Sequence, residues 1–275
     1  MKGRVLRAIA TKDLKEVGQN RAIWIPAVIV PLVFLVILPL AIILVPSLAN
    51  APMGVLLSEQ GPVGMMQRNV PALAAELAGL NERQMWIVLM TGYFLAPFFL
   101  IMPLIFSTVV GAESFVGEKE RKTLEALLYT PATDGELFLG KVLASVIPAV
   151  ALGWLSFLVY AVVVNVAGWP VMARIWFPIA PWWPLMLWVT PAVATLGMAV
   201  TVLISARVNT FMEAYQLSAS LVVLVLALVV GQISGVLYLS VGMGLLIGLA
   251  LWIVDGALIW FGAHTFARSS LLSRL

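Results

Sequence analysis

The sequence predicts an all-α, polytopic membrane protein. Of its 275 residues, 62% are hydrophobic and only 11% are charged, and the mean hydropathy is +1.06. A soluble domain carries roughly 25% charged residues. Several apolar runs exceed the ~20 residues that an α-helix needs to cross the hydrocarbon core of a membrane. A transmembrane β-barrel would show alternating segments of about ten residues, whereas these runs are continuous.

Six of these runs are predicted to be membrane-spanning helices within a single transmembrane domain that covers residues 1–275. The spans are residues 23–45, 86–110, 142–167, 184–206, 214–231 and 241–262. Prolines inside the runs predict kinks, because membrane helices tolerate proline where neighbouring groups satisfy the freed carbonyls. The segment between the last two spans, residues 232–240, is mostly apolar and is a candidate re-entrant segment.

The distribution of basic residues predicts the orientation of the chain. Of the 16 Lys and Arg, 13 flank one side of the predicted spans, and Arg68, Arg83 and Arg174 flank the other. Short loops rich in Lys and Arg remain in the cytoplasm. We therefore expect a multi-pass protein of the cell membrane, with both termini and residues 111–141 in the cytoplasm.

Residues 1–21 carry six Lys or Arg and are predicted to form an amphipathic helix on the membrane surface. Leu6, Ala10, Leu14 and Val17 recur at helical spacing, and the basic side chains would face the lipid headgroups. The alternative is a charged leader that only orients the first span.

The outer segment, residues 46–85, contains a second amphipathic pattern. Apolar residues recur at steps of three and four over residues 63–80, which predicts a helix that is interrupted by or starts at Pro71. A further outer segment, residues 168–184, is rich in Trp and Pro. Trp favours the headgroup layer, so we expect an interfacial anchor there. The alternative is that these aromatic side chains contact a substrate.

Several kinds of chemistry have no support in the sequence. The chain has no cysteine and a single histidine, His264, so thiolate and multi-histidine metal sites are excluded. Gly135, Gly140 and Lys141 match the start of a nucleotide-binding P-loop, but Val142 stands where the Mg²⁺-binding hydroxyl is required. No basic surface interleaved with aromatic residues suggests nucleic-acid binding. We therefore expect neither enzymatic activity nor a bound cofactor or metal in this chain.

Asp255 lies inside the sixth predicted span, where a carboxylate is costly and is a functional candidate by default. Two interpretations remain open: a packing role, or a role with a coupling ion or substrate. Gly244 and Gly248, four residues apart in the same span, allow close helix approach. We expect this pair to pack helices within one subunit.

The densest charge cluster, residues 111–141, separates the second and third spans. Residues 118–129 favour a helix, with Leu124, Leu127 and Leu128 forming a short apolar face. One interpretation is a surface helix solvated by headgroups. A docking element for a cytoplasmic partner explains both the charges and the leucines.

Three segments resemble the type-2 ABC exporter permeases, the membrane subunits of ATP-binding-cassette exporters. Residues 113–141, ESFVGEKERKTLEALLYTPATDGELFLGK, resemble the coupling helix of that family. Residues 10–21, ATKDLKEVGQNR, followed by a proline-rich first span, resemble its opening. Residues 205–219, SARVNTFMEAYQLSA, resemble its short loop before the fifth span.

The resemblance implies a permease that forms half of a substrate route and pairs with itself or a related permease. It also implies two copies of a separate cytoplasmic ATPase, which would hold ATP and Mg²⁺. The coupling interface implied by the resemblance comprises Glu113, Phe115, Glu118, Lys119, Arg121, Lys122, Leu124, Glu125, Leu127 and Leu128, with Arg207 and Glu213 in the second cytoplasmic loop.

The same resemblance places the second span beside the route, with Tyr93, Phe94, Phe98 and Phe99 as candidate lining residues. Ordinary packing explains these aromatic residues equally well, and no motif selects a substrate. Two rivals to the exporter remain: a secondary transporter or channel, and a membrane scaffold that anchors a cytoplasmic partner without transport.

The six-span topology predicts the side on which each loop lies. Reporter fusions after Gln84 and Trp182 should read extracytoplasmic, and fusions after Thr130 and Thr210 should read cytoplasmic, because of the bias of basic residues. A cytoplasmic signal from the fusion after Gln84 would reject the six-span topology.

Overall fold

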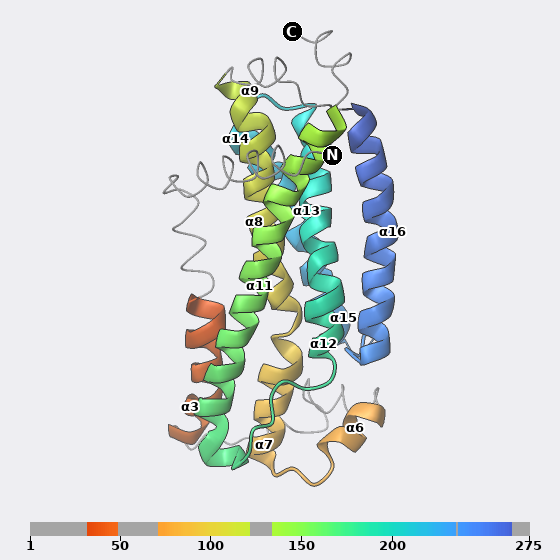
Figure 1. Ribbon diagram of the computed structural model, residues 1–275. Coiled ribbons are helices and arrows are strands. Elements are labelled where there is room, and N and C mark those ends of the chain that lie inside the picture. The colour runs from red at the N-terminus through yellow and green to blue at the C-terminus, as the bar shows by residue number, and fades with distance from the viewer. Residues whose placement is uncertain (1–31, 49–70, 122–133, 235, 266–275) are drawn as a thin grey trace.

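The computed structural model describes residues 32–48, 71–121, 134–234 and 236–265 (Figure 1). In these ranges every regular element is a helix, which confirms the all-α prediction. Five helices there are long and apolar enough to cross a membrane: Glu82–Glu120, Phe138–Met172, Trp182–Ser205, Phe211–Gln232 and Val241–Gly262. They correspond to the second to sixth predicted spans.

The first predicted span and the amphipathic segments are described only in part. Of residues 23–45, an apolar helix is described over Leu32–Leu44, while residues 1–21 lie outside the described ranges. In the outer segment, α6 (Pro71–Leu77) starts at the predicted proline and buries Leu73 and Leu77. The six-span count and the surface helix therefore stay predictions.

The helices form an elongated bundle with the second span at its centre (Figure 1). The apolar window of the second span is 78% buried inside the chain, against 17% for that of the last span. Around it lie α3 (Leu38–Leu48), α11 (Asp134–Met172), α13 (Thr190–Ser205), α14 (Phe211–Ala219) and α15 (Val222–Ile233), while α16 (Val241–Thr265) packs against α13. The outward faces of α11 and α16 are apolar, as expected for helices in lipid.

The second span is not a regular α-helix. Its elements are α7 (Glu82–Ile87), η2 (Val88–Phe94), η3 (Pro97–Leu100), α8 (Ile101–Ala112), η4 (Glu113–Gly117) and α9 (Glu118–Glu120), of which η2 and η4 are π-helical and η3 is a 3-10 turn. Pro97 has no N–H to donate to the Tyr93 carbonyl four residues earlier. The N–H of Leu95 instead reaches Met90, and that of Ala96 reaches Tyr93.

Three consecutive carbonyls of this irregular stretch accept hydrogen bonds from side chains of three other spans. The Tyr160 hydroxyl donates to the carbonyl oxygen of residue 91 at 2.6 Å, and the Trp182 indole donates to that of residue 92 at 2.7 Å. The Gln232 amide donates to the carbonyl oxygen of residue 93 at 3.0 Å. All three donors are buried. An unsatisfied carbonyl is costly in hydrocarbon, so these bonds hold the bundle together at this level.

Trp182, at the start of α12 (Trp182–Pro184), also forms the centre of an aromatic cluster. Four rings lie with centroids 4.8 to 5.6 Å from it: Phe99, Phe157, Tyr160 and Phe177. The prediction that residues 168–184 form an interfacial anchor is therefore wrong for Trp182, which is fully buried because its indole N–H serves a buried carbonyl. Trp169 and Trp183 are 54% and 51% exposed, as an interfacial anchor requires.

The helices that contain the second and third predicted spans are longer than those spans. They extend over Glu82–Glu120 and Asp134–Met172, whereas the predicted spans are residues 86–110 and 142–167, and the span boundaries themselves stay predictions. Residues 111–118 remain buried between neighbouring helices. The charged side chains of this segment suggested a loop from composition alone, but they are paired inside the chain and the segment is buried.

Two further sequence predictions concern the Gly244 and Gly248 pair and the segment between the last two spans. A Cβ at Gly244 would lie 3.1 Å from Pro184, and one at Gly248 would overlap the Trp188 ring. This glycine pair thus packs α16 within its own chain. The described residues 236–240 are not helical, and the Tyr238 ring stacks on Tyr93 with centroids 5.9 Å apart. Whether residues 232–240 are re-entrant stays a prediction.

Replacing Tyr160 by Phe should lower the free energy of unfolding by about 1 kcal/mol, because the carbonyl of residue 91 loses its donor while the ring is kept. Denaturant-induced unfolding in detergent micelles measures this. Tyr215→Phe is the matched control, since the Tyr215 hydroxyl has no hydrogen bond among the described residues. Equal losses in the two variants would contradict the role of the hydrogen bond.

Candidate functional site

One end of the bundle gathers charged side chains from three separate parts of the chain. They are the last turns of the second span (residues 113–121), the first turns of α11 (residues 138–141) and the connection into α14 (residues 206–213). We call this region the charged end. Figure 1 shows α9 and α14 side by side there, far from α6 and α7.

Lys141 is the buried centre of the charged end. Its side chain is 2% exposed, and its Nζ lies 2.6 Å from the Glu118 carboxylate, which is 1% exposed. The same Nζ donates to the Ser114 carbonyl and lies 5.2 Å from the centroid of the Phe115 ring. A buried ammonium is tolerated only when it is paired and hydrogen-bonded, and Lys141 has both kinds of partner. The second and third spans are thereby joined.

A second ion pair, between Arg121 and Glu113, lies on the other side of the second span. Arg121 Nη2 is 2.7 Å from the Glu113 carboxylate, and the two side chains are 50% and 7% exposed. Arg121 directly follows the last helical residue, Glu120, and its side chain extends back along the helix to reach Glu113. This half-exposed pair is worth less than the buried pair of Lys141, since solvent screens it.

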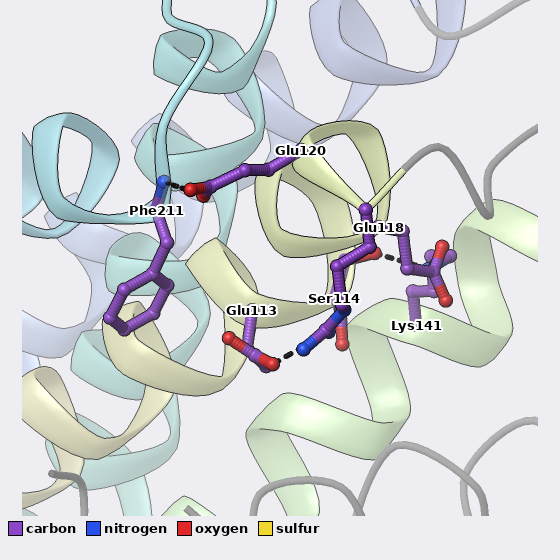
Figure 2. Close-up of polar contacts among 7 residues, drawn as sticks. Glu113, Ser114, Glu118, Glu120, Lys141 and Phe211 are labelled. Carbon is purple, nitrogen blue, oxygen red and sulfur yellow. Dashed lines mark hydrogen bonds and ion pairs between the residues drawn. The ribbon is translucent and has the colours of Figure 1, made fainter.

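The tip of the second span also holds the connection between the fourth and fifth spans. Lys119 Nζ donates to the Val208 carbonyl at 3.0 Å, and a Glu120 carboxylate oxygen accepts from the Phe211 backbone N–H at 2.9 Å. Phe211 begins α14, and a carboxylate is favoured where a helix N-terminus presents free N–H groups. Figure 2 shows Glu120 meeting Phe211 and Glu118 meeting Lys141 on opposite sides of the tip.

Apolar side chains pack next to these polar contacts. Phe115 packs edge-on against Phe138 of α11, with ring centroids 6.4 Å apart, beside Met198 and Val202 of α13. Val116 packs in a separate cluster that includes Val208. The tip of the second span is therefore fixed to α11, to α13 and to the connection into α14.

The predicted interface residues divide into three groups. Glu113, Phe115 and Glu118 are buried, whereas Lys119 and Arg121 are exposed at the tip. Arg207 and Glu213 are exposed on the connection into α14. Residues outside the described ranges are Lys122, Leu124, Glu125, Leu127 and Leu128.

Glu118, the first residue of the helix predicted over residues 118–129, is buried and does not begin a separate helix. It continues the second span and pairs with Lys141. Sequence reasoning missed Lys141 and Glu120 as parts of this site. A signal existed for Lys141, because a lysine between Phe138 and Val142 in an apolar helix requires a buried anion.

The candidate route residues lie away from the charged end. Phe99 is enclosed by rings of its own chain, so ordinary packing accounts for it in this structure. Phe94 and Phe98 are half-buried, and Phe98 stacks with Phe34. Tyr93 is buried, and its hydroxyl donates a hydrogen bond to Glu76.

Asp255 is fully buried on the face of α16 that carries Gly248 and Gly262, toward α13. Neither of its carboxylate oxygens has a hydrogen-bond partner among the described residues. The two interpretations of this residue therefore both stay open.

The fold defines a multi-pass helical membrane protein whose charged end joins several spans. The chain belongs to the ABC-2 family transporter proteins, since the sequence model of that family matches residues 7–266. Proteins of this family are typically non-catalytic membrane subunits and generally partner with an ABC ATPase. Neither the comparison with curated proteins nor that with solved structures found a match.

Removing the buried cation should destabilise the fold more than removing the exposed one. Lys141→Met leaves Glu118 buried without its partner and should cost about 3–5 kcal/mol of unfolding free energy. Arg121→Gln, the control in the half-exposed pair, should cost less than about 1 kcal/mol. Unfolding in detergent measures both.

The double variant Glu118→Gln/Lys141→Met should recover most of the loss, because it removes both charges together. If Lys141→Met and Arg121→Gln lost equal stability, the buried pair would not be the structural centre of the charged end.

Proposed function

We propose that this chain is the permease subunit of an ABC exporter, and that the charged end receives the motion of a separate ATPase subunit. The observation that carries the proposal is the attachment of the second-span tip to the third span and to the connection into α14. A displacement applied at the tip would move these elements together, because each is held to it by ion pairs, hydrogen bonds or buried packing.

The chemistry of the tip suits a docking surface. Lys119, Glu120, Arg121, Arg207 and Glu213 are exposed there and carry both signs of charge. Such rim charges orient a partner and raise its association rate. In the proposal, the predicted apolar face of Leu124, Leu127 and Leu128 supplies the buried centre of the contact, since apolar anchors carry most interface energy.

The assembly we propose contains two permeases and two ATPase subunits. A bundle of this size offers half of a route, and the apolar outward faces of α11 and α16 leave room for a second permease or lipid. ATP and Mg²⁺ belong to the ATPase, and this chain binds neither. In the proposal, the chain lies in the cell membrane with both termini and the charged end on the cytoplasmic side. Transport runs from the cytoplasm to the outside.

Truncating Leu124 or Leu128 to Ala should weaken the complex with the co-expressed ATPase by about 1–3 kcal/mol, the scale of a well-buried interface side chain. Arg121→Glu should slow association and increase its salt sensitivity. Pull-down affinity and ATP-driven uptake into inverted vesicles measure the two effects. Uptake should fall in all three variants while the bundle stays folded.

Leu246→Ala is the matched control, because Leu246 is an exposed leucine on the outward face of α16, away from the charged end. It should leave affinity and uptake unchanged. Unchanged affinity in the Leu124 and Leu128 variants would reject the docking role. Normal ATPase binding without ATP-driven uptake by the unaltered chain would favour the scaffold, and uptake without any ATPase would favour a secondary transporter.

A further inference from the structure

A cavity of about 260 Å³ lies at the end of the bundle opposite the charged end. Four stretches of the chain converge on it: α6, the turn after it, η2 and the connection from α11 to α12. Its lining includes one carboxylate, one guanidinium and two aromatic side chains: Glu76, Arg174, Tyr93 and Trp176. Apolar residues such as Val88 and Met172 form the rest of the wall. Ligand-binding pockets are typically apolar with a small number of placed polar groups, and the lining of this cavity follows that pattern.

The carboxylate and the guanidinium of this cavity are not in contact with each other. Among the described residues, Glu76 and Arg174 form no ion pair, although both line the same space. Glu76 accepts a hydrogen bond from the Tyr93 hydroxyl, which fixes one of its oxygens. Arg174 has no hydrogen-bond or ion-pair partner in the described part of the chain. A carboxylate and a guanidinium are thus available to different parts of one ligand.

The walls of the cavity are held in place before any ligand arrives. The side-chain oxygen of Asn165 accepts the backbone N–H groups of Trp176 and Phe177 at 3.1 and 3.2 Å. The Trp176 ring lies against Gly92, where a Cβ would come within 3.4 Å of it. The Tyr238 ring stacks on Tyr93. Fixed walls reduce the entropy lost on binding, so a small ligand could be held by few contacts.

We propose that this cavity binds a zwitterionic group that carries an ammonium and a phosphate, as in phosphoethanolamine. The ammonium would meet Glu76 and the Trp176 ring, since aromatic rings attract cations. The phosphate would meet Arg174, whose planar fork matches phosphate oxygens. A simple anion would be repelled by Glu76 and a simple cation by Arg174, so a ligand with both charges fits best.

Two sources could supply this group: a phospholipid headgroup or a free molecule. Trp and Tyr are common at the headgroup layer of membranes, and this end of the bundle is rich in both. An apolar groove of about 710 Å³ runs along α11 on the side of Trp169 and Ile175, next to the same connection, and would accept an acyl chain. The binding site does not depend on ATPase coupling, so the permease alone can test it.

The experiment uses the full chain in nanodiscs of phosphatidylglycerol, which has no ammonium, and titrates phosphoethanolamine by calorimetry. We expect saturable binding at least about tenfold tighter than that of ethanolamine or inorganic phosphate alone, because only the zwitterion meets both charges. Glu76→Gln and Arg174→Gln should each weaken it at least about tenfold. Arg174→Lys should lose less, since it keeps the charge.

Glu82→Gln and Arg83→Gln are the matched controls, because these neighbouring exposed charges do not line the cavity. They should change the affinity less than about twofold. Size-exclusion profiles check that every variant is folded. The proposal is overturned if binding is absent, if phosphate alone binds as tightly as phosphoethanolamine, or if the Glu76 and Arg174 variants behave like the controls.

Nanodiscs of phosphatidylethanolamine distinguish the two sources. A weaker apparent affinity for free phosphoethanolamine in these discs means that the lipid headgroup competes for the cavity. An unchanged affinity means that the cavity selects the free molecule. Both results retain the ammonium–phosphate chemistry, and loss of ATPase coupling would affect neither.

Discussion

The structure depends on how the backbone carbonyls of residues 91–93 find donors inside a membrane. Pro97 cannot donate to the helix before it, and the surrounding turns leave the pattern of a regular α-helix. Water is absent from the hydrocarbon core, so the carbonyls of residues 91 and 92 need donors from side chains of other spans, while that of residue 93 also accepts from the Ala96 N–H. Tyr160, Trp182 and Gln232 fill this role, and each therefore ties its own span to the second. The aromatic cluster around Trp182 is arranged by the same requirement.

The second span connects the two chemically distinct ends of the bundle. At one end its tip is fixed by Lys141 and by the connection into α14, and at the other its residue Tyr93 forms part of a cavity wall. Both regions include π-helical turns, η4 and η2, which occur frequently at functional sites. Such turns free carbonyls, and Lys141 uses one of these, that of Ser114, as an acceptor. One irregular helix thus carries both the candidate coupling contacts and the candidate ligand site.

Because the chain belongs to the ABC-2 family transporter proteins, the charged end and the opposite cavity can be considered as parts of one transporter subunit. A permease that works with an ATPase needs one end that transmits force and an interior that responds to it. Buried charge pairs suit the first need, because a pair such as Glu118 and Lys141 loses several kcal/mol if it is separated without compensation. Asp255 is different, since its carboxylate is buried without a hydrogen-bond partner in the described residues. A carboxylate buried in this way is costly in a membrane, so Asp255 stays a functional candidate beside its packing interpretation.

The sequence by itself determined the membrane class, the last five spans, the family and the location of the charge cluster. These follow from composition, run length and local motifs, which are properties of neighbouring residues. It did not determine that Glu118 and Lys141 meet, that Trp182 is buried, or that Glu76 and Arg174 share a cavity. Each depends on residues from separate spans lying side by side, and periodicity says which face is apolar but not which helix covers it. The tertiary structure decided these points, because in a membrane a buried polar group must find its partner across the bundle.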